Sequence, residues 1–210
     1  MPLEIPTPII YPITSGTTRT PEDILRLVEA AVAAKVPLFQ IREKTLSGRD
    51  LYDLTVRAVE ITRGSDTRLL VNDRSDIART AGADGVHLTT QSLPPRVVRK
   101  TYGPEFLIGV STHSLDEARA ARDSGADFVV FGPVFETESK REFGEPQGLD
   151  RFAEVTSELR GFPVVAIGGI TLDNAGSCFE TGARGVAAIR LFNDVERMPS
   201  IVEAIRSVYK

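Results

Sequence analysis

Three stretches of the chain follow one pattern: AGADGVHL (residues 81–88), SGADFVVFG (124–132) and TGARGVAAI (181–189). In each stretch a glycine ends a predicted helix, and a short apolar run follows as a predicted strand. Glycine suits this position because it readily adopts the left-handed conformation that commonly ends a helix. We therefore interpret these glycines as structural, and the repeated order predicts a fold made of strand–helix units.

Short runs rich in β-forming residues recur along the whole chain, and their residues are mostly apolar rather than alternately apolar and polar. This composition is typical of parallel strands that are covered on both faces. The predicted strands are Ile9–Ile13, Leu38–Arg42, Arg68–Asn72, Gly85–Leu88, Leu107–Ser111, Phe128–Gly132, Val164–Ile167 and Gly185–Ile189.

Longer segments between these runs carry apolar residues at spacings of three and four, which predicts amphipathic helices. Thr20 and Pro21 form a cap and a first helical residue. Ser114 with Glu117 matches a capping box, in which each residue bonds the other's backbone. The clearest predicted helices are Pro21–Ala34, Gly48–Arg63, Leu115–Ser124, Thr171–Thr181 and Asp194–Val208.

Regular alternation of strand and helix predicts an α/β fold, a single (β/α)8 barrel that spans residues 1–210. Each unit averages about 26 residues, so the barrel must be compact. An open doubly wound sheet is the alternative. The first strand–helix turn, residues 14–18, lacks the GxGxxG pattern and therefore predicts no nucleotide cofactor.

Composition excludes several classes of protein. The net charge is −4, which argues against a general nucleic-acid binder because such proteins need a basic face. No apolar run approaches the roughly 20 residues that span a bilayer, so we expect no membrane association. Cys178 is the single cysteine, which excludes an intramolecular disulfide. We expect a cytoplasmic protein.

Polar residues at the carboxyl ends of the strands are the candidate site, because barrel enzymes hold their chemistry there. Gln40, Arg42 and Lys44 alternate where the second strand ends and so project to one side. Two cations and an amide in a barrel mouth suit a phosphate or diphosphate, with Arg42 and Lys44 as the candidate catalytic residues. The alternative is a surface ion-pair cluster with Glu43.

The third and fifth strands end in further candidates. Asn72 and Asp73 offer an amide and a carboxylate, which suit substrate binding or ligation of Mg²⁺ by Asp73. Their alternative role is to cap the next helix. Ser111 is placed to donate to an anion. His87 is interpreted as a satisfied interior histidine, and His113 lies just outside the barrel.

The sixth, seventh and eighth strands lead to predicted phosphate contacts. A connection of roughly 16 residues follows the sixth strand, longer than is usual in α/β units, and carries Thr137 and the catalytic candidate Lys140. Its alternative is a plain surface loop. Gly168 and Gly169 let backbone N–H groups approach a ligand, and Arg190 adds charge. Loops after the last two strands often hold phosphate in such barrels.

These motifs resemble the thiamine phosphate synthase/TenI superfamily over nearly the full chain. The matching strings are FQIREK (39–44), LLVNDR (69–74), ADGVHL (83–88), IGVSTHS (108–114), FGPVFETESK (131–140) and VVAIGGI (164–170).

The resemblance implies a barrel enzyme of thiamine biosynthesis that acts on phosphorylated small molecules, with Mg²⁺ as its cofactor. It also implies a homodimer. The implied pyrimidine-diphosphate side consists of Gln40, Arg42, Lys44, Asn72, Asp73, Ser111, Thr137 and Lys140. The implied thiazole-phosphate side is the backbone around Gly168, Gly169, Ala188 and Ile189.

Two positions depart from the family pattern. Ser92 stands where the synthase pattern has an aspartate that helps to hold Mg²⁺, and a neutral hydroxyl binds that ion poorly. Pro133 stands where the TenI-type tautomerase has a histidine, and proline carries no proton. A substitute base would come from His87, His113, Asp73 or Glu136.

Four functions remain open at this point. The loop after the sixth strand, Arg190 and the stretch around Ser92 favour a TenI-like tautomerase that isomerises a thiazole phosphate. The alternative is the Mg²⁺-dependent synthase, which joins a pyrimidine diphosphate to a thiazole phosphate. A third hypothesis is a non-catalytic protein that binds thiamine phosphates, and an unrelated phosphosugar isomerase is a fourth.

Overall fold

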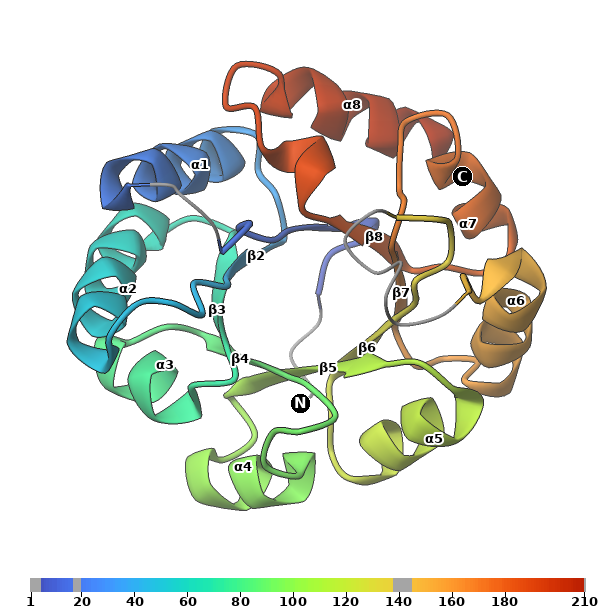
Figure 1. Cartoon of the computed structure of the whole chain (residues 1–210), viewed down its shortest axis with the longest axis horizontal. Coiled ribbons are helices and arrows are strands. Elements are labelled where there is room, and N and C mark those ends of the chain that lie inside the picture. The colour runs from blue at the N-terminus through green and yellow to red at the C-terminus, as the bar shows by residue number, and fades with distance from the viewer. Residues whose placement is uncertain (1–4, 17–19, 138–144, 210) are drawn as a thin grey trace.

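Eight parallel strands form a barrel-shaped sheet, and the helices surround it (Figure 1). The computed structural model describes residues 5–16, 20–137 and 145–209. The strands are β1 (Ile9–Pro12), β2 (Leu38–Ile41), β3 (Arg68–Asn72), β4 (Gly85–Leu88), β5 (Leu107–Thr112), β6 (Phe128–Phe131), β7 (Val164–Ile167) and β8 (Gly185–Ala188). Each predicted strand therefore agrees with an observed one to within one residue at either end.

The helices follow the strands in chain order. They are α1 (Pro21–Ala33), α2 (Gly48–Thr62), α3 (Ser75–Ala81), α4 (Pro95–Tyr102), α5 (Leu115–Asp123), α6 (Gly148–Glu158), α7 (Ala175–Glu180), the short 3-10 helix η2 (Arg190–Phe192) and α8 (Met198–Val208). None of these described helices has both the length and the apolar composition that crossing a bilayer requires.

The strands neighbour one another in the order β1-β8-β7-β6-β5-β4-β3-β2. The remaining gap, between β1 and β2, is bridged where their carboxyl ends meet. Ile13 pairs with Gln40 in a parallel bridge, and the Thr14 N–H donates to the Gln40 carbonyl at 3.0 Å. The sheet is thus nearly closed, which confirms the (β/α)8 barrel and excludes the open doubly wound sheet.

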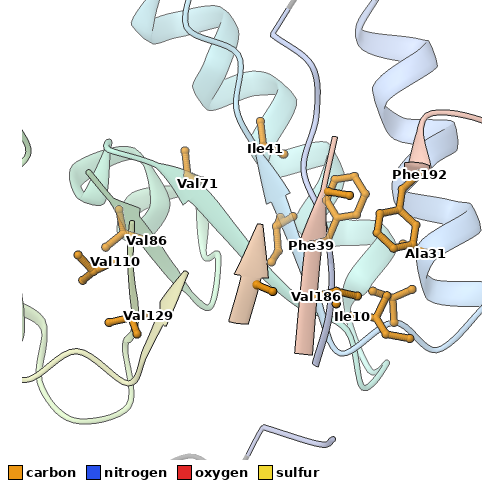
Figure 2. Close-up of a cluster of buried hydrophobic side chains, with 14 of the residues drawn as sticks. Ile10, Ala31, Phe39, Ile41, Val71, Val86, Val110, Val129, Val186 and Phe192 are labelled. Atoms are coloured by element: carbon orange, nitrogen blue, oxygen red, sulfur yellow. The ribbon is translucent and has the colours of Figure 1, made fainter. Parts of the chain in front are cut away.

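Strand residues divide by alternation into two apolar layers. One layer fills the space between sheet and helices, where Ile10, Phe39, Val86 and Val186 lie among the buried side chains of Figure 2. The other fills the barrel interior and includes Ile9, Leu38, Leu70, Leu107 and Phe128. Burial of each such large side chain stabilises the fold by roughly 1.5–3 kcal/mol.

Glycines mark the helix ends as the repeated stretches predict. Gly82, Gly125 and Gly182 have φ values of 84°, 91° and 95° and lie directly after α3, α5 and α7 or one residue beyond. A side chain is disfavoured in this left-handed region. The structural interpretation of these glycines is confirmed.

The helix starts are confirmed in part. Thr20 and Asp23 form a complete capping box at α1. At α5, Ser114 accepts from the Glu117 N–H, but the Glu117 carboxylate accepts from the His113 N–H at 2.6 Å instead of the Ser114 N–H. The predicted capping box at Ser114 is therefore wrong in its second bond, because Glu117 reaches one residue further back.

Two predicted helices begin too early. Helix α7 starts at Ala175 rather than Thr171, because the Asn174 side chain bonds both the Thr171 N–H and the Gly169 carbonyl and holds this segment as a turn. Helix α8 starts at Met198 rather than Asp194, whose carboxylate accepts from the N–H groups of Glu196 and Arg197. In both cases a short polar side chain competes with the helix for backbone groups.

Candidate active site

Three polar side chains at the carboxyl end of β2 become more exposed in sequence order. Gln40 is buried at 1% exposure, Arg42 is half-buried and Lys44 is exposed. Gln40 shares the inward face of β2 with Leu38, which belongs to the interior cluster. Burial therefore decreases from Gln40 in the interior to Lys44 at the mouth. This trend is consistent with the prediction that the three side chains project to the same side of the strand.

Arg42 is held at the closing edge between β1 and β2. Its N–H donates to Thr14 Oγ1 at 2.7 Å, and its Nη1 lies 3.5 Å from the Ser15 carbonyl. Burial lowers the pKa of Arg42, while the nearby Glu43 charge opposes that shift. Glu43 itself is buried and accepts from the Gly16 N–H at 3.3 Å. Among the described residues no ion pair joins Glu43 to Arg42 or Lys44, so the ion-pair cluster is not formed.

Asn72 and Asp73 end the neighbouring strand β3. The residue that caps α3 is Arg74, without a side-chain cap bond, so neither Asn72 nor Asp73 serves the capping role. Asp73 has a φ of 62°, and its N–H donates to the His87 carbonyl at 2.8 Å. Non-glycine residues rarely adopt the left-handed backbone conformation, and those that do are found often at functional sites. The capping alternative is therefore excluded, and both side chains are left for another role.

Few side chains of the described residues are available to bind Mg²⁺. The described residues contain no cluster of three acidic, histidine or cysteine side chains that could enclose a metal. Ser92 is bonded within its own turn, where its Oγ accepts from the Thr89 N–H at 2.8 Å. Mg²⁺ commonly takes one or two carboxylates and completes its shell with water and substrate phosphates. The residues present fit that arrangement, with Asp73 as the protein carboxylate.

Ser111, near the end of β5, belongs to a buried polar chain. Its Oγ lies 2.9 Å from His87 Nε2, and His87 Nδ1 lies 3.3 Å from the Tyr11 hydroxyl. Gln40 Nε2 donates to that hydroxyl at 2.9 Å. His87 is therefore the satisfied interior histidine that we predicted. Tyr11 was missed by the sequence analysis, although a tyrosine in an apolar strand signals a buried hydroxyl that needs a partner.

The segment after β6 is described as far as Thr137, which is partly exposed. Lys140 lies outside the described residues. Pro133, also partly exposed, follows Gly132, whose carbonyl is bonded by His113 Nδ1. His113 is thus engaged with the backbone at the edge of the barrel.

Gly168 and Gly169 follow β7 with φ values of 95° and 64°. A Cβ on Gly168 would stand 2.4 Å from Pro133 Cβ, and one on Gly169 would stand 2.5 Å from the Glu136 carbonyl oxygen. Close approach to the segment after β6 therefore requires both glycines. Their N–H groups donate to no backbone carbonyl among the described residues. Because helix α7 begins at Ala175 rather than at the predicted Thr171, the two glycines do not lie at the start of a helix.

The end of β8 stands beside the glycine segment, because β7 and β8 pair directly. The Ala188 carbonyl accepts from the Ile13 N–H at 3.1 Å. Ile189 is partly buried against the interior cluster, and the exposed Arg190 begins η2. The candidates on β7 and β8 thus form one edge of the mouth, and those on β2 and β3 form another.

Comparison with known proteins gives the family. The family model described as thiamine monophosphate synthase matches residues 10–192. The chain belongs to this family. A Geobacter sulfurreducens protein with a provisional thiamine-phosphate synthase name is 45% identical over 180 residues, 86% of this chain and 84% of that protein. A thiamine-phosphate synthase of Clostridium novyi is 39% identical over 180 residues, 86% of this chain and 88% of its own.

Solved structures agree with this family. The thiamine phosphate pyrophosphorylase from Pyrococcus furiosus superposes with a TM-score of 0.82 and 28% identity, covering 97% of this chain and 98% of its own. The chain is an enzyme of the thiamine monophosphate synthase family. The names of these relatives favour the synthase alternative over the TenI-like tautomerase that the loop sequences favoured.

Proposed function

We propose that the enzyme is a thiamine-phosphate synthase, which joins hydroxymethylpyrimidine diphosphate to a thiazole phosphate and releases diphosphate. One observation carries the proposal. Gln40, Arg42, Asn72 and Ser111 occupy inward-facing positions at the carboxyl ends of three strands, above the apolar interior formed by residues such as Leu38, Leu70 and Leu107. Polar groups that converge on one barrel mouth are the usual arrangement of a barrel active site.

The proposed reaction is a dissociative substitution. The bond between the pyrimidine methylene carbon and the diphosphate oxygen breaks, and its electron pair leaves with diphosphate. The thiazole nitrogen then gives its lone pair to the cationic carbon, forming the new C–N bond. Arg42 stabilises the charge that develops on the leaving group, and Lys44 adds a second cation at the rim. Mg²⁺, when bound, neutralises charge on the diphosphate, with Asp73 as its protein ligand.

The thiazole phosphate is assigned to the opposite edge of the mouth. There the N–H groups of Gly168 and Gly169 are free of backbone acceptors among the described residues, and Arg190 stands nearby at the start of η2. Backbone donors in a left-handed bend bind phosphate oxygens well. This division places the two substrates on different strand pairs, which allows both to be present together.

The test is formation of thiamine phosphate from the two substrates and Mg²⁺, followed by mass spectrometry and by diphosphate release. Product with both substrates, and none when either is omitted, is the expected result. Arg42→Ala should abolish most turnover, whereas Arg57→Ala, on the outer helix α2 and paired with Glu22 at 3.2 Å, should not. Absence of product together with accelerated isomerisation of a thiazole carboxylate phosphate, seen by NMR, would replace the synthase with the tautomerase.

A further inference from the structure

Four polar side chains form a continuous chain across the barrel interior. Gln40 on β2 bonds Tyr11 on β1, Tyr11 reaches His87 on β4, and His87 bonds Ser111 on β5. The distances are 2.9, 3.3 and 2.9 Å. Gln40, Tyr11 and His87 are buried, and only Ser111 is partly exposed toward the mouth. The chain therefore leads from the closed interior to a candidate substrate contact.

The surroundings of this chain are built to hold it. The Phe128 ring packs edge-on against Tyr11 at 5.6 Å between centroids and lies 6.2 Å from the His87 ring. A Cβ on Gly109 would stand 2.8 Å from His87 Nδ1 and 2.4 Å from Phe128 Cζ. Gly109 thus supplies the space that both rings fill. A buried polar group is costly unless it is bonded, so these four side chains are held in positions where each bonds the next.

Donors and acceptors give this chain a direction. Gln40 Nε2 can only donate, so the Tyr11 oxygen accepts and its hydrogen points to His87 Nδ1. A neutral imidazole whose Nδ1 accepts carries its proton on Nε2 and donates to Ser111 Oγ. Burial lowers the pKa of His87 to about 3, which keeps the ring neutral. The Ser111 hydrogen is then left for a group outside the chain.

If the Gln40 amide were flipped, Oε1 would face Tyr11 in place of Nε2. Donor and acceptor would then be exchanged in every hydrogen bond of the series. His87 would carry its proton on Nδ1, Ser111 would donate to Nε2, and only the lone pairs of Ser111 would face the mouth. An anion held by Arg42 would then meet lone pairs rather than a hydrogen. The two directions therefore predict opposite tautomers of His87 and opposite roles for Ser111.

We propose that Tyr11 and His87 are positioning residues, which hold the Ser111 hydroxyl as a hydrogen-bond donor toward an anionic oxygen of the substrate. The identity of that substrate rests on the proposed function. The direction of the chain does not, because it follows from the hydrogen bonds of the protein alone. Neither Tyr11 nor His87 needs to contact substrate for this role.

The first test uses NMR of the protein with ¹⁵N-labelled histidine. The protein has two histidines, His87 and His113, so a His113→Gln variant assigns both signals. We expect the ligand-free His87 ring at pH 7 to be neutral, with its proton on Nε2. A proton on Nδ1, or a charged ring, overturns the proposal. This measurement needs no substrate and no activity, so it succeeds or fails separately from the proposed synthase reaction.

The second test is a double-mutant cycle between Tyr11→Phe and Ser111→Ala. Tyr11→Phe should lower kcat about tenfold, the effect of one ordinary hydrogen bond in the transition state, with KM changed less than twofold. The double variant should be no slower than Ser111→Ala alone, because Tyr11 acts through Ser111. Additive losses overturn the proposal. Tyr102→Phe, which removes the same hydroxyl from a tyrosine that packs on Phe106, is the control and should leave kcat unchanged.

The cycle can also be measured without turnover. If the unaltered enzyme forms no thiamine phosphate, the affinity for inorganic diphosphate, measured by calorimetry, takes the place of kcat. Coupled losses in affinity then support the positioning role even though the synthase reaction has failed. Independent losses overturn the role whatever the reaction is. If Tyr11→Phe does not fold, the tautomer of His87 in the unaltered protein still decides the direction.

Discussion

Side chains form one edge of the barrel mouth, and backbone groups form the other. The side-chain edge, at the ends of β2 and β3, consists of Arg42, Lys44, Asn72 and Asp73. The backbone edge, after β7, consists of Gly168 and Gly169, where no side chain fits. Side-chain atoms can be removed while the backbone stays in place. We therefore expect function and stability to separate on the side-chain edge and to fall together on the backbone edge.

The largest effect is expected on the backbone edge, for Gly169→Ala. Its new Cβ would stand 2.5 Å from the Glu136 carbonyl oxygen and 2.7 Å from Phe135 Cβ. The free energy of unfolding should fall by about 3 kcal/mol or more, and affinity for the thiazole phosphate should fall with it. Urea unfolding and calorimetry measure the two losses.

Gly64→Ala is the matched control for that substitution. Gly64 has a φ of 76°, but nothing lies within 4 Å of its would-be Cβ. It should lose only about 1 kcal/mol, the cost of the left-handed backbone itself. Equal losses at the two positions would show that contact with the segment after β6 plays no part.

On the side-chain edge, Arg42→Ala should reduce kcat/KM roughly 100-fold through loss of charge stabilisation on the leaving diphosphate. The free energy of unfolding should change by less than about 1 kcal/mol, because the Arg42 N–H that bonds Thr14 is retained. Steady-state kinetics and urea unfolding give the two values. A stability loss as large as that of Gly169→Ala would remove the contrast between the edges.

The buried chain beneath Ser111 predicts a pH effect on stability. His87 titrates near pH 3 when folded and near 6.5 when unfolded, so the unfolded chain binds one more proton between these values. The free energy of unfolding should therefore fall as pH falls from 6.5 toward 3, by ~1.4 kcal/mol per pH unit from this residue. Urea unfolding of His87→Asn at pH 7, 6, 5 and 4 should show a slope smaller by that amount. Parallel curves for the two proteins would contradict the assignment.

The smallest effect is expected at Thr112, the neighbour of Ser111. Its hydroxyl is buried and has no hydrogen-bond partner among the described residues. Thr112→Val keeps the shape and removes that unsatisfied group, so the free energy of unfolding should rise by roughly 0.5–1 kcal/mol. Turnover should stay the same, in contrast to Ser111→Ala. Lower stability in the valine variant would mean that the hydroxyl has a partner after all.

Much of the fold could be predicted because its signals are local. Strand residues such as Val164–Ile167 are apolar on both faces wherever they sit in a parallel sheet. Gly82, Gly125 and Gly182 end helices through their own backbone freedom. The position of Arg42 at the mouth follows from alternation beyond β2. Each of these predictions depends on only a few neighbouring residues, so the sequence is sufficient to make it.

The hydrogen bonds at the helix starts were harder to predict, because several nearby backbone groups compete for the same side chain. Glu117 bonds the His113 N–H instead of that of Ser114, and Asn174 holds a turn where apolar spacing predicted helix. The capping interpretation of Asn72 and Asp73 was wrong for a related reason. Asp73 adopts a φ of 62°, which leaves Arg74 at the start of α3.

By itself, the sequence determined the strand–helix order, the glycine helix ends and the family to which the chain belongs. Only the tertiary structure decided that Tyr11 meets His87 across 76 residues of chain, that Gly109 makes room for that imidazole, and that Gly169 packs on the backbone at Glu136. The physical reason is that these contacts form when the sheet curls round and brings β1 opposite β4, and a hydrogen bond acts only over about 3 Å. No spacing along the chain encodes such a meeting.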